Sequence, residues 1–180
     1  MRMKQMICQD EEKINTFLSE VETGYLGLSI QDNPYIVPLN YVWHEGCIYF
    51  HGASEGKKID MIKENSNATF VVSENHGTIA NPIPAKTDTA YLSVMLFGHV
   101  ELVDDLTEAT TAMQYLLNKY VPGYYPTALS QNHVDRYRSS MGSKTTVFKL
   151  VVKTITAKEN VMVEEKKYYK GREMAMDIKK

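Results

Sequence analysis

The chain has 180 residues, of which 43% are hydrophobic and 23% are charged, and its formal net charge is -2. This composition suits a globular protein with a real core, and the slight negative charge disfavours a general nucleic-acid binder. No apolar run reaches the roughly 20 residues of a membrane-spanning helix, and the first residues lack the core of a signal peptide, so we expect a cytoplasmic protein. Cys8 and Cys47 are far apart and share no motif, which predicts free thiols.

Hydrophobic spacing predicts one helix and three strands in the first part of the chain. Apolar residues recur at helical spacing over 10–21, and Gly24 ends this pattern. The expected strands are 25–30, 35–43 and 47–51. Pro38 lies inside the second of these strands. Because proline has no N–H to donate, this position predicts an edge strand or a bulge.

The remaining pattern continues the same architecture. The further strands are expected at 68–73, 89–103 and 145–156. The further helices are expected at 58–64, from Asp104 or Asp105 to Tyr120, and at 130–139. Gly98 predicts a bulge or kink in the long strand that contains it. The segment 74–88 is expected to be a long loop, either functional or mobile. From residue 159 on the chain is mostly charged, so we expect a domain over 1–158 and a mobile or partner-contacting tail over 159–180.

Six strands joined by hairpins, with helices inserted between them, predict an α+β fold around an antiparallel sheet. A sheet this long and apolar is expected to close into a barrel, because closure removes exposed strand edges. The long apolar strand 89–103 and its neighbours carry more apolar surface than two helices readily cover. This surplus, together with the family resemblance described below, predicts a homodimer.

One loop has the composition of an anion site. Small residues lead into Gly56-Lys57-Lys58, and a helical pattern follows at once. Free backbone N–H groups, the positive end of a helix dipole and two lysine charges together favour a bound anion. Three interpretations stay open from the spacing alone: a cofactor phosphate site, an exposed loop with two solvated lysines, and a nucleic-acid contact. The net charge weighs against the third.

The motifs around this loop resemble the pyridoxamine 5′-phosphate oxidase-like FMN-binding split barrels, and within them the 5-nitroimidazole-reductase-like branch. The likeness rests on Pro38-Leu39-Asn40-Tyr41, the strand end Tyr49-Phe50-His51, the turn Gly56-Lys57-Lys58, and Tyr91-Leu92-Ser93-Val94 followed by Gly98. It extends over residues 1–158. The resemblance implies a six-stranded split barrel, a homodimer, and FMN bound at the dimer interface.

The resemblance also implies roles for particular residues. Lys57 and Lys58 match the basic pair that grips the FMN phosphate, and Ser54 and Gly56 belong to the same loop. The strand 38–41 matches the one that lies along the isoalloxazine ring, although an aromatic residue in a strand is also typical of a core. The implied cofactor-binding residues are Pro38, Leu39, Asn40, Tyr41, His51, Ser54, Gly56, Lys57, Lys58 and Ser93.

His51 matches the histidine that ends the third strand near the flavin. It is our candidate catalytic residue, as a group that orients or protonates the acceptor, and the alternative is a histidine that only packs. The other histidines lack metal-ligand spacing, so no metal site is predicted. The sequence also departs from the family at Asn81-Pro82-Ile83-Pro84, which leaves the substrate open. The C-terminal Trp and Arg pattern of true pyridoxamine phosphate oxidases is missing, so vitamin B6 oxidation is not expected.

Two functions follow from the resemblance. One is an FMN-dependent oxidoreductase that reduces a small, flat, electron-poor compound, such as a nitro-aromatic, with electrons from a reduced nicotinamide. The other is a non-enzymatic protein of the same fold that holds flavin or haem. The proline-containing segment 81–87 separates them: a loop that roofs an open flavin face favours the enzyme, and a loop that fills this face favours the binder.

Overall fold

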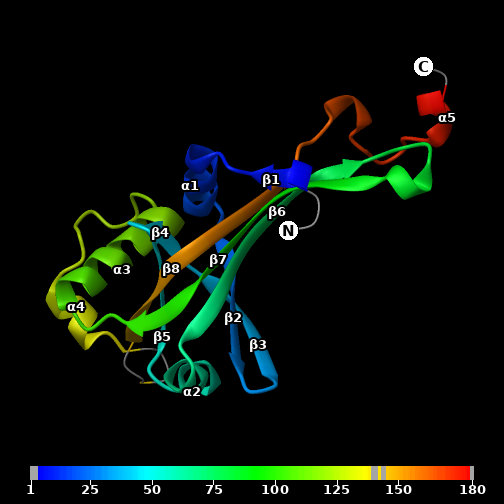
Figure 1. The fold of residues 1–180 in the computed structure, drawn as a ribbon. Helices are drawn as coiled ribbons and strands as arrows, with labels where there is room; N and C mark the ends of the chain where they lie inside the picture. Colours follow the sequence, from blue (N-terminus) through cyan, green and yellow to red (C-terminus); the bar gives the residue numbers. More distant parts are fainter. Residues whose placement is uncertain (1–3, 139–141, 143–144, 179–180) are drawn as a thin grey trace.

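The computed structural model describes residues 4–138, 142 and 145–178. Its centre is an 8-stranded antiparallel sheet with the strand order β3-β2-β6-β7-β8-β5-β4, and β1 pairs with β8 (Figure 1). The strands are β1 (Ile7–Cys8), β2 (Thr23–Ile30), β3 (Asn33–Asn40), β4 (Val42–His44), β5 (Cys47–Ala53), β6 (Asn67–Ile79), β7 (Asp88–Leu102) and β8 (Thr145–Asn160). The α-helices are α1 (Glu11–Glu20), α2 (Lys57–Glu64), α3 (Leu106–Tyr120), α4 (Gln131–Arg136) and α5 (Met174–Ile178). Single 3₁₀ turns are η1 (Lys4–Met6), η2 (Pro84–Lys86) and η3 (Glu164–Lys166).

The sheet closes at one corner and is open elsewhere. β3 and β4 stand at the two ends of the strand order, yet only Tyr41 separates them in the chain. The sheet must therefore curl until its two ends meet at this residue. Beyond the corner, β4 pairs with β5 only as far as Tyr49, and residues 50–53 of β5 pair with β8 alone in the described part of the chain. The predicted α+β split barrel is confirmed, with two short additional strands, β1 and β4.

Two apolar cores hold the helices to the sheet. The barrel interior is filled by inward side chains of the strands together with Phe17 and Leu18 of α1. The second core packs β4, β5 and β8 against α3, and includes Val42, Tyr49, Ala112, Leu116 and Val147. The helices α1 and α3 each begin at an aspartate cap. The side chain of Asp10 accepts a backbone N–H group of the first turn of α1, and that of Asp105 accepts one of the first turn of α3. The helical spacing read over 10–21 is confirmed by α1, whose Phe17 and Leu18 are buried.

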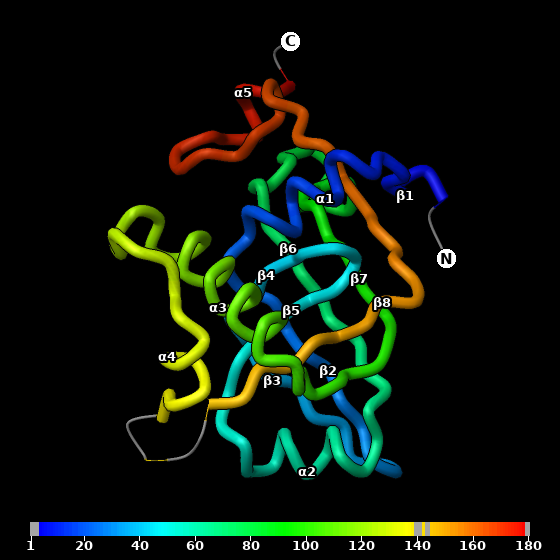
Figure 2. Tube along the Cα trace, turned by 90° about the vertical axis from the view of Figure 1, so that its left-hand side faces the viewer, coloured from blue at the N-terminus to red at the C-terminus, as the bar shows by residue number. Residues whose placement is uncertain are grey.

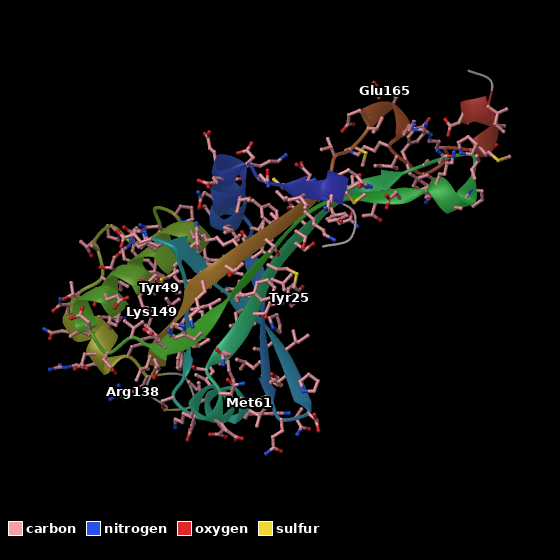
Figure 3. All side chains as sticks on the ribbon, viewed as in Figure 1. Tyr25, Tyr49, Met61, Arg138, Lys149 and Glu165 are labelled. Atoms are coloured by element: carbon pink, nitrogen blue, oxygen red, sulfur yellow. The ribbon has the colours of Figure 1, made fainter. Side chains whose placement is uncertain are left out.

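Within the described residues, one side of the sheet has no helix over it. Alternation along β2, β3, β6 and β7 points every second residue away from the barrel interior, and we call this uncovered side the outer face. Its apolar members include Tyr25, Ile36, Met95 and Phe97, which are 45%, 70%, 38% and 37% exposed. Tyr25 lies on the side of the sheet away from α3, whereas Tyr49 and Lys149 lie toward that helix (Figure 3).

Of the segment expected to be a long loop at 74–88, residues 74–79 and 88 are strand, which corrects the prediction. β6 continues to Ile79 and pairs with β7 up to Asp88, with a bulge at Gly77 that lets the ladder continue. The last residues of β6 extend past the barrel and cover no core, so they need no apolar side chains. The sequence therefore lacks the apolar alternation by which a strand is recognised. Only 80–87 connects the two strands. In β7 the predicted irregularity at Gly98 is confirmed, since the register shifts there.

The β6–β7 hairpin and the C-terminal residues together form a projection. We call residues 75–89 and 161–178 the arm. Ile79 bridges to Lys167, and backbone N–H groups of Ala80 and Tyr168 donate across the same seam. Arg172 then fixes the C-terminal turn by donating to Asp177 and to the carbonyl oxygens of Lys167 and Glu165. Figures 1 and 2 show the arm at one end of the molecule and α2 at the other.

Candidate functional site

The helix α2 starts with a glycine in a conformation that other residues avoid. Gly56 has φ 102° and ψ 171°, and no side chain caps the helix. The Gly56 carbonyl accepts the N–H groups of Ile59 and Asp60. In the described part of the chain, the N–H groups of Lys57 and Lys58 have no acceptor. The helix therefore presents two free donors at its positive end.

The two lysine side chains lie on either side of the split in the barrel. Lys57 Nζ is 5.0 Å from the centroid of the Tyr35 ring on β3. Lys58 Nζ is 5.5 Å from the centroid of the Phe50 ring on β5. Among the described residues neither ammonium group has an acidic partner within ion-pair distance. Aromatic faces hold cations without neutralising them, so both charges stay available for an anion.

A glycine on the neighbouring strand makes room for one of these charges. A Cβ atom at Gly52 would lie 2.8 Å from Lys58 Nζ, closer than real contacts allow. Partial burial in this niche lowers the pKa of Lys58 below its ordinary value. Gly52, Tyr35 and Phe50 were not predicted from the sequence. The pairing of a lysine with a ring on another strand depends on tertiary structure and leaves no local pattern.

His51 lies on the other side of β5 from Phe50 and Gly52, as strand alternation requires. It is the cross-strand partner of Val147 on β8, so their side chains share one face of the sheet. Partial desolvation lowers the pKa of the His51 imidazole, and the positive charge of Lys58 lowers it further. Neither ring nitrogen has a hydrogen-bond partner within the described residues. The lowered pKa favours the neutral imidazole at pH 7, and both ring nitrogens are available to a ligand.

A cavity of about 490 Å³ adjoins His51 through its strand partner. Val147 and Thr145 of β8 form its floor, and α3, α4 and the segment between them form its walls. Most of the lining residues are apolar or aromatic, among them Met113, Leu117 and Tyr137. The cavity has the size and character of a site for a small, flat organic molecule. It was not foreseen, because α4 has only 6 residues and a weak apolar pattern.

The other predicted cofactor residues are placed in three ways. Ser54 is exposed in the loop before α2, close in the chain to the two lysines. Pro38 and Asn40 are exposed on the edge strand β3, as the proline predicted, and Leu39 points inward and packs on the core. Tyr41 is 0% exposed. Its ring packs against Phe70 inside the barrel, so the structure realises the core alternative for this side chain.

Ser93 lies on the outer face, away from the lysines of its own chain. Tyr35 of β3, which contacts Lys57, pairs with Leu28 of β2, and Leu28 pairs with Ala68 of β6. Ala68 pairs in turn with Gly98 of β7, so Lys57 lies at the same height along the sheet as Gly98. Ser93 is five residues from Gly98 along β7, or about 17 Å at about 3.3 Å per residue. Within one chain, Pro38, Asn40 and Ser93 therefore lie on the outer face, apart from Lys57 and Lys58 at the start of α2.

The chain was compared with protein families and known proteins. The family model described as pyridoxamine 5′-phosphate oxidase matches residues 10–159. The chain belongs to this family. Comparison with curated proteins gave no match. Family membership agrees with the split barrel and with the resemblance carried by the loop motifs.

Several solved structures are similar to this chain in fold, and they differ in the function for which they are described. A proposed 5-nitroimidazole antibiotic resistance protein of Bacteroides thetaiotaomicron is 23% identical, with TM-score 0.68, and the match covers 85% of this chain and 86% of the other. The flavocytochrome Anf3 of Azotobacter vinelandii is 18% identical, with TM-score 0.75, covering 90% and 72%. An FAD and haem binding protein of Mycobacterium smegmatis is 15% identical, with TM-score 0.70, covering 86% and 73%. At these identities the likeness shows a common fold. No helix in the described ranges has the length and apolar character to cross a membrane.

Proposed function

We propose that this member of the family is an FMN-binding flavoprotein. The observation that carries the proposal is the pair Lys57 and Lys58 at the start of α2, both held on aromatic rings and without acidic partners in the described chain. Two ammonium groups, two free N–H groups and a helix dipole match the charge and acceptor number of a phosphate monoester. The donor set thus fits the terminal phosphate of FMN. Beside the two lysines, residues 50–53 of β5 pair with β8 alone in the described chain. The other edge of this stretch has backbone N–H and carbonyl groups that can bind the rest of the cofactor.

We further propose a homodimer that joins two equivalent sites. The apolar side chains Tyr25, Ile36, Met95 and Phe97 are exposed on the outer face, where no helix of the described chain covers them. A second copy would bury this surface and is the simplest partner for it. Pro38, Asn40 and Ser93 lie on this outer face and would be buried in the same contact.

The proposed reaction is reduction of small, electron-poor compounds, such as nitro-aromatics, with a reduced nicotinamide as donor. FMN would supply the electron transfer. The chain would bind its phosphate through Lys57 and Lys58, accept a flat molecule in the cavity beside Val147, and place the neutral His51 imidazole at the rim. The likeness to the Bacteroides protein supports this substrate class. The two thiols, Cys8 and Cys47, are free, which favours the reducing cytoplasm as the location.

The alternative is a non-enzymatic flavin- or haem-binding protein. The likeness to a flavocytochrome and to an FAD and haem binding protein supports this second function. The absorbance spectrum of the purified protein separates the cases, since flavin and haem absorb differently, and chromatography of the released cofactor distinguishes FMN from FAD. Anaerobic bleaching by a nicotinamide donor, followed by reoxidation with a nitro-aromatic, is the expected result for the enzyme. A bound flavin that neither donor nor acceptor affects would identify a binder, and a colourless protein that takes up no FMN would overturn the proposal.

A further inference from the structure

The tip of the arm cannot reach the flavin site proposed for its own chain. Lys57 lies level with Gly98 on β7, and the tip of the hairpin begins at Asp88. These positions are ten residues apart along one strand, or about 33 Å at about 3.3 Å per residue. Figures 1 and 2 show α2 and the arm at opposite ends of the molecule. If the segment 81–87 roofs a flavin, the flavin must belong to another subunit.

The arm is an ordered element that leaves its own apolar side chains uncovered. Backbone pairing joins its two parts, and Arg172 fixes the turn before α5. At the tip, the side chain of Asn81 accepts the N–H of Ile83, and prolines on either side of Ile83 restrict the backbone. Yet Ile83 is 53% exposed and Tyr169 is 59% exposed. Other exposed apolar side chains of the arm are Val161, Tyr168, Met174, Met176 and Ile178. Apolar surface on an ordered projection is typical of a contact with another chain.

We propose that in the homodimer the arm of each subunit lies over the flavin site of its partner and forms the wall that closes it. This inference rests on the proposed function. The occupant of the arm's apolar surface is a second copy, because β6 and β7 run without interruption from the outer face into the arm. Whatever pairs with the outer face therefore also meets the arm.

In the proposed dimer, the two-fold axis lies across the strands at Ser93, midway between Gly98 and Asp88. With the axis there, the arm's tip is level with the partner's Lys57. The exposed residues Met95 and Ile36 at the α2 end of one outer face then oppose the arm end of the other subunit. The apolar outer face of each subunit is thereby covered by the arm of the other. Ile83 and the flat ring of Tyr169 are the arm residues we assign to the cofactor, since an aromatic face packs well on a ring system.

Mixed dimers test whether the arm acts on the partner's site. One full-length variant carries Lys57→Ala and Lys58→Ala, and the other carries Ile83→Asp and Tyr169→Asp. Each homodimer should bind FMN at least about tenfold more weakly than the parent. In a mixed dimer, co-expressed with two affinity tags, one site combines both defects and the other combines an intact loop with an intact arm. We expect half of the sites to bind FMN with parental affinity and parental shielding of flavin fluorescence from iodide. An arm that acts on its own chain would leave no parental site.

A control variant and a cross-link make the test specific to the arm. Tyr124→Asp changes a residue that is 73% exposed and lies outside the arm, and it should leave FMN affinity and shielding unchanged. In a Cys8→Ser and Cys47→Ser background, Ile83→Cys on one copy and Glu55→Cys on the other should join under a short bis-maleimide only as a dimer. Cross-linking between two Ile83→Cys arms in its place would overturn the proposal, as would mixed dimers without parental sites. If the parent itself binds no FMN while the Ile83–Glu55 cross-link forms, the proposed function fails and the arrangement of the arm stands.

Discussion

The ammonium group of Lys119 lies 4.0 Å from the centroid of the buried Tyr41 ring, at the corner where β3 passes into β4. Lys119 also donates to the carbonyl oxygens of Leu18 and Val21 at the end of α1. The next residue, Tyr120, accepts the N–H of Tyr41 through its hydroxyl oxygen. The last turn of α3 thus ties α1 to the closed corner of the barrel. This packing explains why Tyr41, expected beside a cofactor ring, has its side chain in the core.

The first prediction concerns the pH dependence of stability at this corner. Burial lowers the pKa of Lys119 from 10.5 to about 8. Between these values the unfolded chain holds a proton that the folded chain lacks, so the free energy of unfolding should rise with pH. Lys119→Met removes this titration. Because the ammonium group is partly exposed and screened by solvent, urea unfolding should show the parent gaining about 1–2 kcal/mol relative to the variant between pH 8 and pH 10.5. A difference that stays constant over this range would show that Lys119 does not titrate there.

The second prediction concerns the phosphate site. Lys57→Ala and Lys58→Ala together should strip FMN, because each lost charged contact costs about 1.5–3 kcal/mol of binding free energy. The melting temperature should change little, since these side chains make no ion pair in the described chain. Lys63→Ala, at the other end of α2, is the matched control and should bind FMN like the parent. Fluorescence titration measures both, and a double variant as yellow as the parent would refute the phosphate assignment.

How far the sequence predicts this structure depends on where the determining contacts lie. The helix stripes, a helix start at Asp104 or Asp105, the edge position of Pro38 and the irregularity at Gly98 follow from local rules. The structure confirms them and places the helix cap at Asp105. The end of β6 does not, because a strand that leaves the barrel no longer alternates. For the site, the loop motif identified the lysines, and their roles stay predictions. Their aromatic neighbours depend on the distance between two strands, which single-sequence patterns do not encode.

The third prediction concerns assembly. Ile36→Asp and Met95→Asp place two charges on the outer face, and burying a charge in an apolar contact is costly. Sedimentation velocity at micromolar concentration should show a dimer for the parent and a monomer for this variant. The monomer should lose FMN as well if the site is shared between subunits. Tyr124→Asp serves as the control for an added surface charge. A parent that sediments as a flavin-bound monomer would contradict the homodimer.

The last prediction concerns His51, whose imidazole has no hydrogen-bond partner within the described chain and whose strand partner Val147 lines the cavity. His51→Gln keeps a polar side chain but removes the titration. If His51 protonates or orients the acceptor, the variant should retain FMN and slow one half-reaction by about 10²–10⁴-fold. The opposing view, that His51 only packs, predicts lower thermal stability and unchanged turnover per bound flavin.

The pH profile of the two half-reactions decides between these views. Because burial and Lys58 lower the pKa of His51, the protonated imidazole accumulates only on the acidic side of its ordinary value of 6.5. A rate that depends on this proton should therefore rise as the pH falls below about 6.5 in the parent and stay flat in His51→Gln. Stopped-flow traces, normalised to flavin content and recorded from pH 5 to pH 8, measure this difference. Identical profiles for parent and variant would leave His51 with a structural role, since a group that only packs has no titration to lose.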